Sequence, residues 1–128
     1  MKRPALMGIL NVTPDSFSDG YATADAAIRQ FHRLVADGAD IIDIGAESTR
    51  PGATPLTPEQ EWARLAPVLA GVMPQGHGVR ISVDTRHVLT AARALDLGVH
   101  TINDVGGLAD APMRELLSQH SGDIIVMH

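Results

Sequence analysis

Short apolar runs alternate along the chain with longer segments in which apolar residues recur at helical spacing. The runs cover residues 5–10, 39–44, 79–83, 99–102 and 123–127, and each is short enough for one β-strand. Helical spacing covers residues 24–37, 57–72, 86–97 and 112–119. This uninterrupted alternation predicts a parallel sheet with right-handed crossovers. Two architectures share the pattern, a doubly wound open sheet and a (β/α)8 barrel.

The first and third helical segments carry signals for their ends. Thr23 is a candidate N-cap for the first helix, and Gly38 is its expected stop, as Gly98 is for the third. The expected inward residues of the first helix are Ile28, Phe31, Leu34 and Val35. Those of the third are Val88, Leu89, Ala92 and Leu95. Both helices should therefore pack one apolar face on the sheet.

The second helical segment begins with a complete start signal. Thr57 can cap the helix, Pro58 suits its first turn, and Gln60 completes a capping box. Its expected inward residues are Trp62, Leu65, Leu69 and Val72. Pro67 lies inside this segment and should kink the helix, because its ring removes a backbone donor and crowds the preceding turn.

Polar residues stand at the C-terminal side of nearly every apolar run. They are Asn11, Asp43, Asp84, Asn103, Asp104 and His128. In a barrel the chemistry is built on this face from strand ends and the following loops, so the pattern favours the barrel. The first run should form a strand that is buried on both faces through Met7, Ile9, Leu10 and Val12. Asn11 within it then needs a polar partner.

The chain is shorter than a closed barrel. Its 128 residues fit one domain, residues 1–128, whereas a (β/α)8 barrel has about 250 residues. We therefore expect an α/β fold that comprises about the first five βα units of a (β/α)8 TIM barrel, a partial barrel. Alone, it would have open edge strands and a wet inner face, which favour association, for example as a homo-oligomer.

Composition excludes several classes of function. The net charge is −5 and the basic residues are scattered, so the sequence does not indicate a positively charged surface for nucleic acid. The chain has no cysteine, which fits a cytoplasmic protein and excludes thiolate chemistry. We find no signal peptide, no apolar run of the ~18 residues that a membrane span needs, and neither GxGxxG nor GxxxxGK[ST]. The histidines show no zinc-ligand spacing.

Three blocks of sequence resemble dihydropteroate synthase, the folate-pathway family that joins a pterin pyrophosphate to p-aminobenzoate. The first is MGILNVTPDSFSDG (residues 7–20) and the second is GADIIDIGAESTRPGA (38–53). The third combines ISVDT (81–85) with INDVGG (102–107). Their conjunction in this order is specific. The resemblance implies a (β/α)8 barrel that makes 7,8-dihydropteroate and diphosphate, with this chain as the N-terminal portion.

The resemblance also implies a pterin pocket and a metal ligand. Asn11 corresponds to a residue that helps to hold Mg2+, and an amide oxygen suits this hard cation. Asp84 and Asn103 correspond to the pterin-binding pair, and Val105 and Met127 to apolar walls of the pocket. Without the resemblance, Asp84 could equally be a helix cap, and the two apolar residues could be ordinary core.

The remaining implied residues lie in two loops. Thr49 and Arg50 correspond to residues near the diphosphate, and Pro51 to one that lies against the arylamine. Phe17 corresponds to part of the p-aminobenzoate pocket, with Asp15 beside it as a candidate orienting group. The alternative interpretation of Arg50 is a solvent-exposed cationic side chain in a loop, without a role in binding.

Two positions depart from the family pattern, since Tyr21 and Ala46 stand where the family usually has glycine. Tyr21 could stiffen the first loop. Two other functions stay open. One is a non-catalytic fragment or pterin-binding module that needs a partner to complete the barrel. The other is a methyltetrahydrofolate methyltransferase-type domain. Such a domain binds a pterin in a similar pocket but lacks the SFSDG and STRPG loops of the first two blocks.

Overall fold

Strands and helices alternate through the parts of the chain that the computed structural model describes, which are residues 4–13, 23–46, 55–73, 78–104, 111–119 and 123–126. The strands are β1 (Met7–Asn11), β2 (Ile41–Gly45), β3 (Arg80–Asp84), β4 (Thr101–Asp104) and β5 (Asp123–Val126). The helices are α1 (Thr23–Ala36), α2 (Pro58–Val72), α3 (Val88–Asp96) and α4 (Ala111–Ser118). No helix among these residues is long and apolar enough to cross a membrane.

The strands form one sheet in the order β1-β2-β3-β4-β5, and each neighbouring pair is parallel. A doubly wound sheet reverses its strand order at a switch point. Here sequence order and spatial order agree, as they do in a barrel. The strand order therefore decides between the two architectures that the sequence left open.

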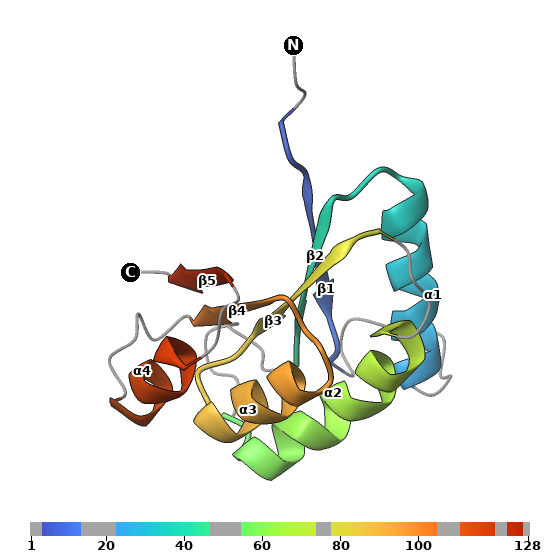
Figure 1. The fold of residues 1–128 in the computed structure, drawn as a ribbon. Helices are drawn as coiled ribbons and strands as arrows, with labels where there is room; N and C mark the ends of the chain where they lie inside the picture. Colours follow the sequence, from blue (N-terminus) through green and yellow to red (C-terminus); the bar gives the residue numbers. More distant parts are fainter. Residues whose placement is uncertain are drawn as a thin grey trace.

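The helices lie on one side of this sheet. Figure 1 shows α1 to α4 as an arc to the right of the strands and below them. The hydrophobic core fills the space between sheet and helices. Its largest fully buried members are Leu10, Ile42, Ile44, Ile102, Phe31, Leu65, Leu69 and Met113. Right-handed crossovers along a consecutive parallel sheet place every helix on the same face.

The opposite face of the sheet carries both polar and apolar side chains and is partly open. In β1, Leu10 is 1% exposed on the helix side, whereas Ile9 is 65% exposed and Met7 43%. The expectation that β1 is buried on both faces is therefore wrong for the described residues. Successive side chains of a strand point to opposite faces, and only one face of β1 is covered by the helices.

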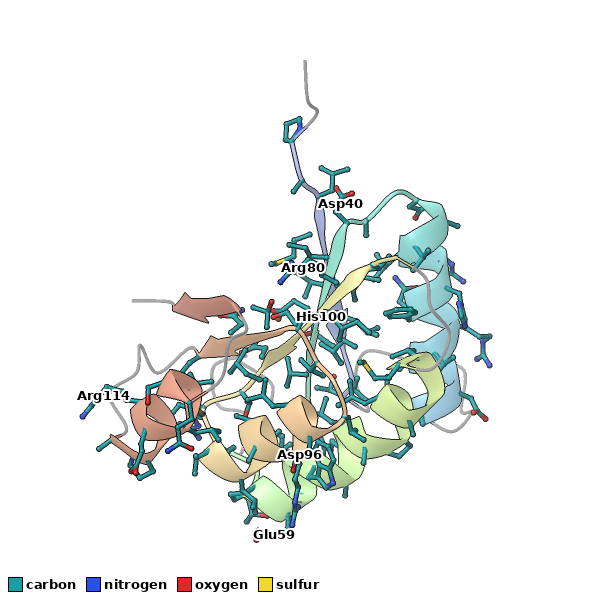
Figure 2. The ribbon with its side chains drawn as sticks, viewed as in Figure 1. Asp40, Glu59, Arg80, Asp96, His100 and Arg114 are labelled. Atoms are coloured by element: carbon teal, nitrogen blue, oxygen red, sulfur yellow. The ribbon has the colours of Figure 1, made fainter. Side chains whose placement is uncertain are left out.

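The starts of the strands are tied together by hydrogen bonds at the other end of the sheet. Leu6 N donates to Asp40 Oδ2 at 2.8 Å. His100 N donates to Ile81 O, and Ile81 N donates to His100 Nδ1, both at 3.0 Å. Figure 2 shows Asp40, Arg80 and His100 along this part of the sheet. These two hydrogen bonds continue the β3–β4 pairing beyond the first residue of β4, because the His100 side chain accepts the bond from Ile81 N. They help to hold the register of the two strands.

Helix α2 confirms the start predicted for it. Gln60 N donates to Thr57 Oγ1 at 3.1 Å, and Thr57 N donates to Gln60 Oε1 at 2.9 Å. The helix runs through Pro67 to Val72. Pro67 and Ala63 are exposed, so the carbonyl that the ring deprives of a partner can reach water. Leu65, Leu69 and Val72 are buried as expected, with Trp62 partly buried.

Two helix starts differ from the prediction. Thr23 is the first residue of α1 and not the residue before it. Helix α3 begins at Val88, with His87 at its N-cap position, two residues later than the apolar spacing indicated. Its fully buried residues are Thr90, Ala91 and Ala94, while Val88 and Leu95 are only partly buried. The buried face of α3 is thus formed by small residues, and Ala91 and Ala94 belong to the hydrophobic core. Both glycine stops are confirmed, at φ 99° for Gly38 and 98° for Gly98.

Candidate functional site

A row of four residues crosses the C-terminal ends of four adjacent strands. Asn11 is in register with Gly45, Gly45 with Asp84, and Asp84 with Asn103. Residues in register share one face of a sheet, and this row lies on the face away from the helices. With about 4.8 Å between neighbouring strands, the row is about 14 Å long. The strands thus bring together the Asn11, Asp84 and Asn103 that the sequence predicted as site residues.

The glycine in this row makes room for the carboxylate beside it. A Cβ atom added at Gly45 would lie 3.2 Å from Asp84 Cβ and 3.5 Å from Asp84 Oδ2. The Asp84 side chain therefore lies across the place that a side chain at position 45 would take. Gly45 was not among the predicted site residues, although its position at the end of a buried strand is a signal for close approach.

Asn103 is held by a buried carboxylate. Its Nδ2 donates to Asp43 Oδ2 at 3.1 Å, and the two side chains are 6% and 5% exposed. Asp43 Oδ1 and Asn103 Oδ1 are both buried without a hydrogen-bond partner among the described residues. Such unmade bonds cost about 1–3 kcal/mol each, and a ligand with N–H donors would remove that cost. Two acceptor oxygens are thus available beside Asp84.

Sequence reasoning noted Asp43 as a strand-end residue but gave it no role. The signal was present, because Asp43 stands within the apolar run IIDIG. A carboxylate in a strand that is otherwise buried needs a specific partner. What the sequence does not contain is the identity of that partner, which lies 60 residues away.

A second buried carboxylate, Glu61 on α2, supports the end of β3 from the helix side of the sheet. Thr85 Oγ1 donates to Glu61 Oε1 at 2.7 Å and accepts from His87 N at 3.0 Å. Thr85 N donates to Asn103 O at 3.1 Å. Glu61 and Thr85 are 1% and 2% exposed. This chain of bonds fixes the residue that follows Asp84.

The start of α3 shows whether Asp84 caps this helix. The N-cap position of α3 belongs to His87, and its side chain makes no capping bond. The amide of His87 donates to Thr85 Oγ1 at 3.0 Å. The capping alternative for Asp84 is therefore wrong. The sequence analysis did not predict a role for Glu61, because it interpreted the first turn of α2 only as a signal for the start of the helix.

Helix α2 also holds the end of β2. Arg64 Nη1 donates to Ala46 O at 3.3 Å, one turn after Glu61. Val12 N donates to Gly45 O at 2.7 Å, which extends the β1–β2 pairing. Ala46 itself is fully buried in the hydrophobic core. Its methyl group thus fits the position where the family usually has glycine.

Seven predicted site residues lie outside the described part of the chain. They are Asp15, Phe17, Thr49, Arg50, Pro51, Val105 and Met127. Tyr21 lies outside it as well. Their assignments stay predictions.

The described residues can be tested for their fit to Mg2+. They contain no group of three or more His, Asp or Glu side chains that could hold a metal ion. Asn11 is exposed at the end of β1 and offers one amide oxygen. Mg2+ commonly keeps several waters and takes its other oxygens from substrate phosphates, with one or two protein ligands. Asn11 fits such a site as a single protein ligand.

Comparison with known proteins places this geometry in a family. Residues 7–128 match the family model described as pterin binding enzyme. The dihydropteroate synthase of Neisseria meningitidis serogroup C is 49% identical over 133 residues, which cover 100% of this chain and 46% of that protein. The chain therefore spans about half the length of the curated relatives that it matches.

Solved structures give the same result. The dihydropteroate synthase from Anaplasma phagocytophilum with bound 6-hydroxymethylpterin-monophosphate matches with a TM-score of 0.88 and 50% identity, over 97% of this chain and 48% of that one. The Xanthomonas albilineans enzyme with 4-aminobenzoic acid matches with a TM-score of 0.93 and 41% identity, over 98% and 46%. These matches confirm the predicted partial barrel. The chain belongs to the family of pterin binding enzymes.

Proposed function

We propose that this chain forms the pterin-binding part of a dihydropteroate synthase. The observation that carries the proposal is the row of Asp84 and Asn103, together with two buried acceptor oxygens, Asn103 Oδ1 and Asp43 Oδ1, that have no hydrogen-bond partner in the described part of the chain. A pterin ring presents its 2-amino group and N3–H side by side, and a carboxylate accepts two parallel bonds from such a pair. The relatives named above support the same ligand class.

The proposed reaction forms a C–N bond at the methylene group attached to the pterin ring. The amine of p-aminobenzoate attacks this carbon, the C–O bond to diphosphate breaks, and the amine proton leaves to diphosphate or solvent. In this proposal Thr49 and Arg50 bind the diphosphate, and Pro51 and Phe17 contact the arylamine, which Asp15 helps to orient. Val105 and Met127 line the pterin ring.

Asn11 has a different part in the proposal. It would hold Mg2+ through its amide oxygen at the end of β1, next to the diphosphate. When bound, the cation supplies positive charge for the diphosphate oxygens as the C–O bond breaks. Arg50 would add a forked donor to the same oxygens.

A second candidate function rests on the open inner face. Ile9 is 65% exposed on the side of the sheet that a complete barrel would enclose. This exposure favours a pterin-binding module that needs further strands, supplied in the same polypeptide or by a partner, for turnover. A methyltransferase-type domain is less well supported, because the relatives named above are dihydropteroate synthases.

Ligand binding and turnover separate these candidates. The purified chain is titrated with 6-hydroxymethyl-7,8-dihydropterin and assayed for dihydropteroate with the pyrophosphate ester, p-aminobenzoate and Mg2+. We expect binding by the wild type, loss of binding in Asp84→Ala, and unchanged binding in Asp96→Asn, an exposed carboxylate at the end of α3 (Figure 2). Binding without turnover, restored by a chain with later barrel strands, supports the module. No binding by a folded wild type would refute the proposal.

Two further properties belong to this proposal. A cytoplasmic location is supported by the absence of cysteine from the sequence. Association of identical chains is supported by the exposed apolar side chains of Met7 and Ile9 on the inner face. Fractionation of the source cells and sedimentation of the purified chain test the two properties separately.

A further inference from the structure

We infer that Glu61 and Arg64, one turn apart on α2, are positioning residues that fix the place of Asp84 in the candidate site. Glu61 acts through Thr85, the residue that directly follows β3. Arg64 acts through Ala46, the residue that directly follows β2. The consequence for ligand affinity rests on the proposed function, whereas the positioning of the two strand ends does not.

The hydroxyl group of Thr85 takes part in two hydrogen bonds of fixed direction. The backbone N–H of His87 can only donate, so Thr85 Oγ1 accepts this bond at 3.0 Å. The single hydrogen of the hydroxyl group then goes to Glu61 Oε1 at 2.7 Å. Glu61 and Thr85 are 1% and 2% exposed, so water does not compete for the bond between them, and the low local dielectric strengthens it. Glu61 therefore fixes the side-chain orientation of Thr85.

The backbone of Thr85 carries this constraint to Asp84. Thr85 N donates to Asn103 O at 3.1 Å, and this N–H belongs to the peptide group that joins Asp84 to Thr85. Thr85 is thus held by β4 through its backbone and by α2 through its side chain. A rotation of the peptide group would turn the backbone of Asp84 and move its carboxylate. The position of that carboxylate hence depends on both anchors.

A small shift matters because Asp84 lies close to β2. A Cβ atom added at its register partner Gly45 would be only 3.2 Å from Asp84 Cβ. Directly after Gly45, Ala46 O accepts from Arg64 Nη1 at 3.3 Å. The first two turns of α2 therefore hold both sides of this close contact. The bond from Arg64 is longer and only partly buried, so we expect it to contribute less than the bond to Glu61.

The test uses variants that keep or remove each bond at similar size. Glu61→Gln keeps an acceptor oxygen for the Thr85 hydroxyl, whereas Glu61→Leu removes it. Arg64→Met removes the donor to Ala46 and keeps an unbranched side chain. Val72→Ala is the control, because it truncates a buried side chain at the other end of α2. Folding of every variant is checked by circular dichroism and urea unfolding.

Amide hydrogen exchange, followed by NMR, tests the positioning without a ligand. The rate at Thr85 N–H is divided by the rate at His100 N–H, which joins β4 to β3 at the opposite end of the same strand pair. We expect this ratio to rise about tenfold in Glu61→Leu, because one buried bond near Thr85 is lost. It should stay near the wild-type value in Glu61→Gln and Val72→Ala. Equal acceleration of both amides in Glu61→Leu would overturn the inference, since global destabilisation affects the two ends alike.

Ligand affinity on the same variants tests the consequence for the site. Dissociation constants for 6-hydroxymethyl-7,8-dihydropterin are measured by fluorescence. We expect binding to weaken about tenfold in Glu61→Leu, as when a partner that orients a ligand-binding side chain is removed. Arg64→Met should weaken it less, and Glu61→Gln and Val72→Ala should bind like the wild type. Wild-type affinity in Glu61→Leu, or an equal loss in Val72→Ala, would overturn the effect on the site.

The two measurements can fail separately. If the folded wild type does not bind the dihydropterin, the proposed function fails, and the exchange ratio still decides whether α2 positions the strand ends. If Glu61→Leu does not fold, Thr85→Val removes the same bond from the other side and takes its place in both measurements. An unchanged exchange ratio in the folded variant overturns the inference whatever the ligand does.

Discussion

Removal of the Thr85 hydroxyl tests whether the buried Glu61 holds the end of β3. In Thr85→Val the side chain keeps its size, but Glu61 Oε1 loses its donor at 2.7 Å and His87 N loses its acceptor at 3.0 Å. Because Glu61 is 1% exposed, water cannot readily replace the hydroxyl. Leaving a buried charged acceptor without its partner costs about 2 kcal/mol. For a chain of this length that corresponds to a fall in Tm of roughly 8 °C.

A double-mutant cycle separates this bond from other effects. Thr85→Val, Glu61→Leu and the double variant are unfolded in urea, and Thr85→Ser is the control that keeps the hydroxyl. Replacing both partners by apolar groups removes the unsatisfied carboxylate, so the double variant should lose less free energy of unfolding than the two single variants together. A coupling of about 1–2 kcal/mol is expected for groups in direct contact. Additive losses, or a Thr85→Ser loss equal to that of Thr85→Val, would refute the reasoning.

Four other substitutions test the geometry. Gly45→Ala should weaken binding of 6-hydroxymethyl-7,8-dihydropterin severalfold with a smaller effect on Tm, because the new Cβ would lie 3.2 Å from Asp84 Cβ; unchanged binding by titration would contradict this. Leu10→Ala should lower the free energy of unfolding by about 2–5 kcal/mol, whereas Ile9→Ala should lower it by well under 1 kcal/mol, because these residues are 1% and 65% exposed. Both values are measured by urea unfolding, and equal losses would show that the inner face of β1 is covered. Gly98→Ala, at φ 98°, should cost about 1 kcal/mol by the same measurement, and a stabilised variant would argue against the left-handed turn.

Local chemistry made much of the fold predictable. The capping box at Thr57 and Gln60 depends on residues three apart, and both partners are visible in the sequence. The stops at Gly38 and Gly98 depend on a backbone conformation that glycine favours. The predicted helix starts at Thr23 and near Arg86 were wrong by one or two residues, because an apolar period locates the buried face but not the residue where a helix begins.

The candidate site was predictable in part. Polar residues at the ends of apolar runs indicated Asn11, Asp84 and Asn103, and the strand register brings these three residues into one row. Asp43 and Glu61 received no role, because a carboxylate's function depends on its partner. Those partners lie 60 and 24 residues away.

The sequence by itself determined the alternation of strands and helices, the main caps and stops, and the residue types available at the strand ends. Each of these follows from the backbone preferences and periodicity of a few neighbouring residues. Through its motifs, the sequence also determined the resemblance that the family match confirms.

The tertiary structure decided the strand order, which face of β1 is covered, and how the buried polar side chains pair. Strand order excluded the doubly wound sheet, and the one-sided helices explain why Leu10 is buried while Ile9 is exposed. The bond between Asp43 and Asn103 exists only because β2, β3 and β4 pair in register. Such contacts depend on how distant segments pack, and no local pattern contains that information.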